Sequence, residues 1–376
     1  MMARLEEICA INMGQSPDSS TYNEDGNGLP FFQGNADFGE IYPAVRMWCS
    51  EPTKIAREKD ILISVRAPIG ALNIANCECC IGRGLATLTV NEDICAQEYL
   101  WHALSGKVDE LNSKGTGSTF KAINKKTLSE TEIPLPPIDE QRKIAAILDK
   151  VSDLIAKRQQ QLDKLDEAVK ARFVEMFGDV IQNTKLWPQY IFSDITTSRL
   201  GKMLDAKQQT GMCQYPYLAN FNVQWFRFEL DNLNEMDFNE ADRIEFELRD
   251  GDLLVCEGGE IGRCAVWHNE IQPCYFQKAL HRVRCKKEIV LPDYLAWWFK
   301  YNCDNKGFAA IEGAKATISH LPGAKLKALL VSVPPIEQQK QFATFVEQTE
   351  KTKTTVSHSL EKLETLKKAL MQEYFR

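Results

Sequence analysis

Two long stretches of the chain carry apolar residues at alternating spacings of three and four. In the first stretch, the apolar positions are Leu148, Val151, Ile155, Leu162, Leu165, Val169 and Met176. In the second stretch, they are Val346, Val356, Leu360, Leu363, Leu366, Leu370 and Tyr374. This spacing places the apolar side chains on one face of an α-helix and is typical of coiled coils.

Each stretch follows a Pro-Pro pair. Proline disfavours a helical conformation in the residue before it, and acidic residues are favourable in the first turn of a helix. We therefore predict helices that begin near Asp139 and near Glu337. No glycine or proline occurs between Glu337 and Arg376, so the second helix is expected to continue to the end of the sequence.

Short β-branched runs bounded by turn residues precede each long helix, which is typical of strands. The first set comprises residues 61–66, 69–75 and 84–90, and the second set comprises residues 252–257, 263–268 and 280–285. A shorter helical stretch follows each set, at residues 97–106 and 293–302. The pattern predicts α+β domains with a sizeable β component.

The chain is an internal repeat. Residues 133–148 align with residues 331–346 at an offset of 198, with five identities in sixteen positions around the shared Pro-Pro. Upstream the offset falls to 195, 192 and 186, as expected when a fold is duplicated and its loops then change length. We predict four segments: a first domain, a long helix, a second domain and a second long helix, at residues 1–132, 133–178, 179–330 and 331–376.

A helix of 39 residues is about 58 Å long at about 1.5 Å per residue, and such a length needs a partner. Duplication favours a pseudo-two-fold arrangement, so we expect the two helices to form an antiparallel coiled coil with one domain at each end. Arg158 and Arg172 interrupt the apolar stripe. They either fix the register of the coiled coil or contact a partner.

Composition places the chain among folded globular proteins of two or three domains, with 376 residues, 44% hydrophobic and 26% charged. No apolar run approaches the roughly 18 residues of a membrane helix, and the first residues lack the pattern of a secretory signal. We therefore expect a cytoplasmic protein.

The net charge of −7 excludes a wholly basic nucleic-acid binder. Residues 1–132 hold twelve Lys and Arg against eighteen Asp and Glu, a net charge of −6. Any nucleic-acid site must therefore be a local patch.

The twelve cysteines are scattered, and only Cys77, Cys79 and Cys80 lie close together in sequence. Cys77 and Cys80, with Cys95 and His102 downstream, leave a metal site open as one interpretation. No second pair stands at zinc-site spacing, so we favour buried reduced thiols.

Motifs of catalysis are absent from the sequence. It contains no phosphate-binding G-x-x-x-x-G-K-[ST], no G-x-G-x-x-G, no G-x-S-x-G and no H-E-x-x-H. The five histidines are dispersed, and neither Pro-Pro pair has the neighbours that adenine methyltransferases use to grip a flipped base. We expect a protein that is not an enzyme and holds no cofactor or metal.

The segments PLPPIDEQRKIAAILD (134–149) and SVPPIEQQKQFATFVE (332–347), each behind a G-x-x-x-T-x-x-x-[IL]-x-x-x-x-L run, resemble a known family. They are similar to the repeated regions of the specificity subunit of type I restriction-modification systems. The resemblance extends along the whole chain, including the connector Phe177–Val180 between the first helix and the second domain.

The resemblance implies a non-catalytic reader of double-stranded DNA. Residues 1–132 and 179–330 are then target recognition domains that each read one half of a bipartite, asymmetric site, while the helices fix the gap. It also implies two copies of an adenine-N6 methyltransferase subunit docked on the helices, and a translocase/nuclease subunit bound through them. S-adenosylmethionine, ATP and Mg are expected on those partners only, in a bacterial or archaeal cytoplasm.

The candidate DNA contacts are polar residues beside predicted strands and loops at comparable places in the two copies. They are Asn35, Arg66, Arg83, Lys114, Ser118, Thr119, Lys121, Asn220, Lys278, His281, Arg282, Lys315, Thr317 and Ser319. Residues 114–121 and their counterpart, 313–319, are either phosphate-gripping loops or simple turns. The remaining candidates are either base-reading groups or solvated surface side chains.

Two further alternatives remain open at this stage. The same architecture would suit a coiled-coil scaffold whose duplicated heads bind protein or glycan, and the acidic first domain is compatible with it. The Trp297-Trp298-Phe299 run could stack on bases, but we interpret it as packing of its own helix.

Overall fold

The structure is a computed structural model that describes residues 1–117, 121–204, 209–309 and 320–375. It divides into two compact units. The first combines Met1–Gln160 with the C-terminal stretch that begins at Val356, and the second is Gln161–Thr355.

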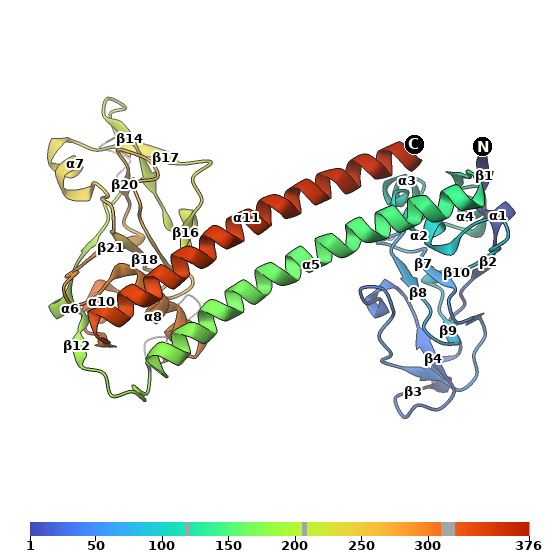
Figure 1. The fold of residues 1–376 in the computed structure, drawn as a ribbon, viewed down its shortest axis with the longest axis horizontal. Helices are drawn as coiled ribbons and strands as arrows, with labels where there is room; N and C mark the ends of the chain where they lie inside the picture. The colour runs from blue at the N-terminus through green and yellow to red at the C-terminus, as the bar shows by residue number, and fades with distance from the viewer. Residues whose placement is uncertain (118–120, 205–208, 310–319, 376) are drawn as a thin grey trace. The chain divides into compact units, whose positions relative to one another are not determined.

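Two helices of 40 residues, α5 (Ile138–Phe177) and α11 (Ile336–Phe375), each contribute to both units (Figure 1). Each begins one residue before the predicted position, directly after its Pro-Pro pair. The prediction of two long helices is therefore confirmed. None of the helices that the structure describes combines the length and the apolar character needed to cross a bilayer.

The first unit is a mixed α/β body. Its strands are β1 (Met2–Arg4), β2 (Cys9–Met13), β3 (Tyr22–Asn23), β4 (Leu29–Phe32), β5 (Trp48–Cys49), β6 (Ile55–Ala56), β7 (Ile61–Ser64), β8 (Leu72–Ile74), β9 (Cys79–Ile81), β10 (Leu85–Val90) and β11 (Glu132–Pro134). Its shorter helices are α1 (Leu5–Ile8), η1 (Ser19–Thr21), η2 (Asn35–Asp37), α2 (Gln97–Ser105), α3 (Val108–Ser113) and α4 (Lys125–Ser129).

The second unit repeats this order of elements. Its strands are β12 (Gln189–Ile191), β13 (Thr196–Leu200), β14 (Gln214–Leu218), β15 (Val223–Gln224), β16 (Arg227–Phe228), β17 (Asn234–Asp237), β18 (Leu253–Cys256), β19 (Cys264–Val266), β20 (Tyr275–Phe276), β21 (Leu280–Cys285) and β22 (Leu330–Ser332). Its shorter helices are α6 (Phe192–Ile195), η4 (Asn220–Asn222), α7 (Glu240–Phe246), α8 (Pro292–Asp304) and α10 (Gly323–Lys327).

Two sheets recur with the same topology in both units. The first unit has a sheet of order β2-β10-β7-β8, and the second has the sheet β13-β21-β18-β19. A two-stranded sheet accompanies each, β1-β11 in one unit and β12-β22 in the other. Each unit also contains one parallel pair, β4 with β9 and β14 with β20. The predicted strands and the α+β class are confirmed, and the duplication extends to the pairing of these two sheets. The other strands pair differently, as β3-β5-β4-β9-β6 in the first unit and as β17-β14-β20 and β15-β16 in the second.

A buried glutamine joins each long helix to its domain. Gln141 accepts a hydrogen bond from the Ala96 N–H at 2.9 Å, and its Nε2 donates to the carbonyls of Ile94 and Pro136 at 3.1 and 2.8 Å. Both Gln141 and its counterpart Gln339 are 0% exposed. The last Gln of the repeated Pro-Pro motif therefore has a structural role, which is to attach the long helix to its domain.

Gln339 makes the corresponding three bonds in the second unit. It accepts from the Leu291 N–H at 2.8 Å and donates to the carbonyls of Ile289 and Pro334 at 3.0 and 2.8 Å. Gln141 and Gln339 therefore make equivalent hydrogen bonds in the two units.

The long helices run antiparallel within each unit. In the first, Phe375 at the end of α11 shares a core with Ile144 and Leu148 near the start of α5. In the second, Phe177 at the end of α5 lies 5.4 Å, ring to ring, from Phe342 near the start of α11. The predicted antiparallel pairing is thus confirmed.

The apolar seam of the helix pair is only partly buried. Val151, Val169 and Val356 are buried, but Leu366 is 46% exposed although its spacing predicts a core position. A pair of helices without a third neighbour leaves one side of such residues open to solvent. Arg172, on the same stripe, lies 6.0 Å from the Phe345 ring and pairs with Glu175 at 2.8 Å.

Candidate nucleic-acid interface

A short 3-10 turn occupies the same place in both units and is held in the same way. In η2, the Asp37 carboxylate accepts hydrogen bonds from the N–H groups of Gln33 and Gly34, at 2.7 and 3.3 Å. In η4, the Asn222 amide oxygen accepts from the Ala219 N–H at 2.8 Å. Asn35 and Asn220 are the first residues of these turns.

In the first unit this turn forms one wall of a hollow of about 320 Å³. Three candidate DNA contacts, Asn35, Arg66 and Arg83, line it together. Their sequence positions are up to 48 residues apart, and β7 and β9 bring them together. We call this set, with Gln33 and Arg46 on the same lining, the arginine hollow.

The guanidinium groups of the arginine hollow differ in whether the protein already engages them. Arg46 forms an ion pair with Asp37 and donates to the Ala36 carbonyl at 2.7 Å. Arg66 and Arg83 are exposed, and in the described part of the chain no side-chain hydrogen bond or ion pair engages either of them. Their donors are therefore available within a segment whose net charge is −6.

Lys121 and Ala122, shortly before α4, lie beside the strand end that carries Arg66. Ala122 forms an isolated bridge with Arg66, and the Lys121 carbonyl accepts from the Ala67 N–H at 3.0 Å. These contacts place the exposed Lys121 near the end of the strand that carries Arg66. Ser118 and Thr119 lie outside the described residues.

Lys114 is engaged by a carboxylate. Its Nζ lies 2.6 Å from Glu110, which also pairs with Lys107 at 2.8 Å. Partial burial raises the pKa of Glu110, but the hydrogen bonds from Lys107 and Lys114 outweigh burial and hold this pKa below its ordinary value. Lys114 therefore presents a neutralised charge at the surface.

The corresponding place in the second unit has different side chains. Gly258 forms an isolated β-bridge with His320, just as Arg66 does with Ala122 in the first unit. A glycine therefore occupies the position that is equivalent to Arg66. The exposed Lys278 stands where the first unit has Arg83, since both come two residues after equivalent strands. The second unit thus offers a single ammonium group at these two places.

The η4 turn is tethered and carries an exposed aromatic ring. Asn220 Nδ2 donates to the Gly258 carbonyl at 3.0 Å, and Arg263 donates to the Asn220 side-chain and main-chain oxygens at 3.2 and 3.0 Å. Phe221, at the position of Ala36, is 54% exposed. Phe221 was not among the sequence candidates, because those were chosen as polar residues that can hydrogen-bond to DNA.

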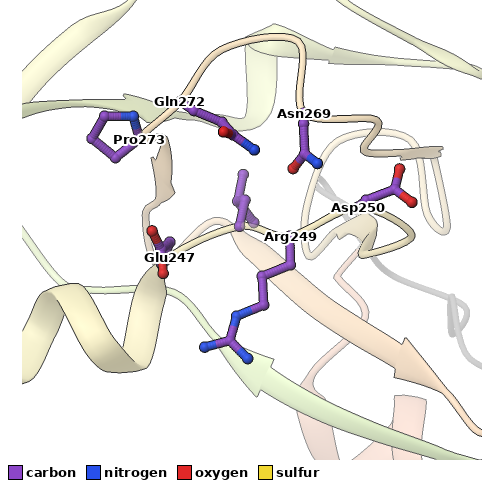
Figure 2. Close-up of a pocket in the computed structure, with 7 residues that line it drawn as sticks. Glu247, Arg249, Asp250, Asn269, Gln272 and Pro273 are labelled. Carbon is purple, nitrogen blue, oxygen red and sulfur yellow. The ribbon is translucent and has the colours of Figure 1, made fainter.

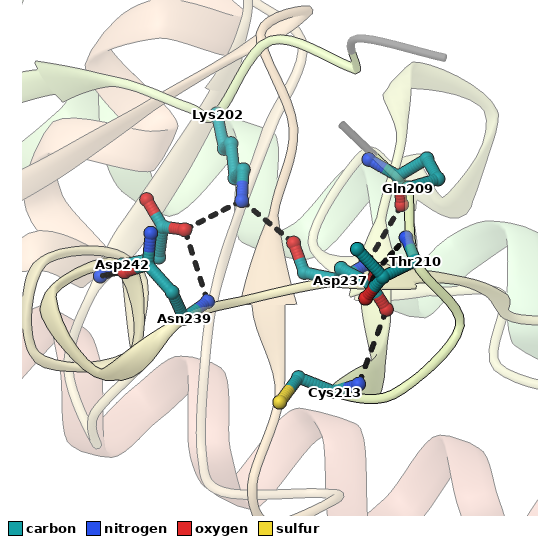
Figure 3. Close-up of polar contacts among 7 residues, drawn as sticks. All are labelled: Lys202, Gln209, Thr210, Cys213, Asp237, Asn239 and Asp242. Carbon is teal, nitrogen blue, oxygen red and sulfur yellow. Dashed lines mark hydrogen bonds and ion pairs between the residues drawn. The ribbon is translucent and has the colours of Figure 1, made fainter. Parts of the chain in front are cut away.

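A second lysine near Lys278 is already paired (Figure 3). Lys202 accepts from the Lys278 N–H through its main-chain carbonyl, at 2.9 Å. Its Nζ lies 2.5 Å from Asp242 and 2.6 Å from the Asp237 carbonyl. Its charge is therefore compensated, unlike that of Lys278.

The Asp237 carboxylate holds the chain around Thr210. It accepts from the Thr210 hydroxyl at 2.7 Å and from the Cys213 N–H at 3.2 Å (Figure 3). It also accepts from the Gly211 N–H at 2.9 Å. These hydrogen bonds, led by that of the Thr210 hydroxyl, lower the pKa of Asp237. A fixed carboxylate organises this edge of the second unit.

Two further candidates make internal contacts. His281 is 2% exposed, and its Nε2 lies 3.0 Å from the Leu321 carbonyl. Arg282 donates to the carbonyls of Glu245 and Glu247 at 2.7 and 3.3 Å, beside the C-terminus of α7. Burial lowers the pKa of both side chains, that of Arg282 to about 10. Lys315, Thr317 and Ser319 lie outside the described residues.

The second unit also has a polar pocket of about 440 Å³ that contains none of the candidate residues (Figure 2). Glu247 and Asp250 stand against the single cation Arg249 on its lining. Its negative balance does not suit a phosphate group.

Two of the three clustered cysteines are core residues, whereas Cys77 is only half-buried. Cys79 and Cys80 are 0% exposed, and burial raises the pKa of Cys79 to about 12. Across the described ranges, no group of three or more His, Cys, Asp or Glu side chains could hold a metal ion. Trp297, Trp298 and Phe299 likewise lie in the core of the second unit, which confirms their interpretation as packing residues.

Comparison with known proteins gives a family. A family model described as "Type I restriction modification DNA specificity domain" matches residues 1–167 and again residues 185–365. The chain is 22% identical over 412 residues to the type I restriction enzyme EcoBI specificity subunit of Escherichia coli, covering 99% of this chain and 84% of that protein.

Two other similarities are partial in coverage or identity. The putative type I restriction enzyme MjaX specificity subunit of Methanocaldococcus jannaschii is 44% identical over 165 residues, which span 44% of this chain but only 39% of that protein. The crystal structure of the type-I restriction-modification system S subunit from M. genitalium matches 100% of this chain and 96% of its own, with a TM-score of 0.62 and 12% identity, which shows the fold. With two family matches that together span most of its length, the chain belongs to the type I restriction modification DNA specificity family.

Proposed function

We propose that this chain is the DNA-reading subunit of a type I restriction-modification complex and that its units read two unlike half-sites. One observation carries the proposal: two units with the same four-stranded sheet and the same glutamine hydrogen bonds present different side chains at the places equivalent to Arg66 and Arg83. A reader of identical half-sites would need identical side chains there. The different side chains therefore favour a bipartite, asymmetric site.

Specificity subunits of this family are not catalytic, so the chemistry belongs to partner subunits. Two copies of an adenine-N6 methyltransferase would dock on α5 and α11, and a translocase/nuclease would bind through them. S-adenosylmethionine, ATP and Mg would be held by those partners. The half-exposed apolar seam of the helix pair, including Leu366, supports a role in docking.

The long helices would set the gap between the half-sites. Each has 40 residues and is therefore about 60 Å long, which allows half-sites about one turn of DNA apart once the widths of the domains are subtracted. Domain boundaries at residues 1–132, 133–178, 179–330 and 331–376 form part of this proposal.

Sequencing of modified bases in cells that express the chain with its methyltransferase partner tests the proposal. We expect methylated adenine in a split motif with a fixed gap, and no such mark in control cells that express the methyltransferase alone. Methylation without a bipartite motif would contradict the proposal, as would loss of any dependence on this chain.

Deletion of one heptad from the middle of each long helix tests whether helix length sets the gap between the half-sites. It shortens each helix by about 10 Å, so we expect the gap to shrink by about three base pairs while both half-site sequences stay the same. The control carries alanine at exposed positions of the same heptads and should keep the original gap. A change in either half-site would show that the helices do more than set distance.

A further inference from the structure

We infer that the first unit reads guanine with Arg66 and Arg83, and that Arg46 is a positioning residue held by Asp37. The inference rests on the proposed function, because it names a base that one half-site must contain. It also predicts that the two half-sites differ in chemistry: the half read by the second unit is not read through guanidinium groups at this place.

Guanine suits the free groups of the arginine hollow. In the major groove, guanine presents two acceptors, O6 and N7, and the fork of a guanidinium group can bond to both. Arg66 and Arg83 line one hollow, and within the described ranges their guanidinium groups have no competing hydrogen bond or ion pair. They can therefore donate without first breaking an internal contact.

The lining combines amide groups with the guanidinium groups. Gln33 and Asn35 add amide groups that can hydrogen-bond to a neighbouring base. Asp37 lies on the same lining, but its ion pair with Arg46 compensates its charge. Replacement of guanine by 7-deazaguanine separates a base contact from a phosphate contact, because it leaves every phosphate in place.

Arg46 has a different role because it is already engaged. Its ion pair with Asp37 and its bond to the Ala36 carbonyl join the η2 turn to the chain at residue 46. The side chain of Asp37 is only 12% exposed, so this pair is partly protected from water. Arg46 therefore fixes the wall of the arginine hollow on which Asn35 lies.

The second unit cannot read guanine in the same way. Gly258 removes the guanidinium at the position of Arg66, and Lys278 replaces a fork by a point charge. Arg263, the nearby guanidinium, is bound to both oxygens of Asn220.

The test uses the full chain with its methyltransferase partner and duplexes that contain its split site. Each guanine of each half is replaced in turn by 7-deazaguanine, which lacks the N7 acceptor, and Kd is measured by fluorescence anisotropy at one salt concentration. We expect at least one replacement in one half to raise Kd by about tenfold. The second half should show no such dependence on Arg66 or Arg83.

Variants assign the effect to residues. R66A and R83A should weaken binding of the guanine-containing half and should abolish the response to 7-deazaguanine there. R66K and R83K are matched controls that keep the charge, so they should keep the salt dependence but lose discrimination against 7-deazaguanine. K278A, in the second unit, should leave the response of the first half intact.

Three results would overturn the inference. These are a half-site sensitive to R66A and R83A that contains no guanine, wild-type binding that does not respond to 7-deazaguanine, and equal losses for all sequences, which would indicate phosphate contacts. The second uses wild-type protein alone and does not depend on how a variant folds. Absence of any split site would instead contradict the proposed function, so the two failures are distinguishable.

Discussion

The two units share their four-stranded sheet and the attachment of their long helix but differ in the side chains at one equivalent turn. The same order of this sheet and the same three hydrogen bonds of a buried glutamine occur in both. At the equivalent turn, however, the first unit has Ala36 beside two arginines that no described residue engages in an ion pair, whereas the second has the exposed Phe221 beside Gly258. Buried hydrogen-bonded positions therefore tolerate little change after duplication, while exposed loop positions are free to acquire new specificity.

The largest expected effect tests the shared framework. Q141A and Q339A each remove three hydrogen bonds and leave buried backbone groups unpaired, so each should cost about 2–4 kcal/mol of the free energy of unfolding. Chemical denaturation measures the total loss, and hydrogen exchange assigns it to peptides around Ala96 in one unit or around Leu291 in the other. The exposed neighbour Glu140 provides the control E140A. Clearly unequal losses would show that the two glutamines do not stabilise their units to the same extent.

A smaller expected effect tests the difference between Phe221 and Ala36 at the equivalent turns. F221A should weaken binding to the half-site of the second unit by about tenfold, because the exposed ring would no longer pack against a base or a thymine methyl of the bound DNA. Anisotropy titrations with each half mutated in turn would separate the two halves. The matched control A36G, in the first unit, should have little effect on either half. Weaker binding of F221A to the guanine-containing half would contradict this assignment of Phe221 to the half-site of the second unit.

The smallest effect concerns acid stability. His102 is 4% exposed and lies 2.7 Å from Asp149, whereas its counterpart in the second unit is the non-titrating Trp297. Burial lowers the pKa of His102 below its ordinary 6.5, although Asp149 opposes this shift.

Below pH 6.5 the unfolded chain therefore binds a proton that the folded chain does not. The stabilisation is complete above that pH and is lost as the pH falls toward the folded pKa. NMR titration of the ring nitrogens should give a pKa below 6.5, and H102Q should remove this contribution to acid sensitivity from the first unit. A pKa at or above 6.5 would show that the Asp149 pair dominates over burial.

The sequence by itself determined the long helices, the duplicated α+β domains and the order of segments. Apolar periodicity, Pro-Pro boundaries and β-branched runs are local signals, and each element forms where its own residues favour it. The repeat also placed Asn35, Arg83, Asn220 and Lys278 at comparable places in the two copies. It did so because duplication preserves order along the chain.

Only the tertiary structure decided which candidates face solvent and which meet one another. His281 and Arg282 occupy strand positions that look available in sequence, yet one is buried and the other caps carbonyls near α7. Arg46 was not a candidate, although it lies on the same lining as Arg66 and holds the turn through Asp37. The physical reason is that a hollow is built from segments far apart in sequence, and its shape depends on side-chain pairing that no local pattern encodes.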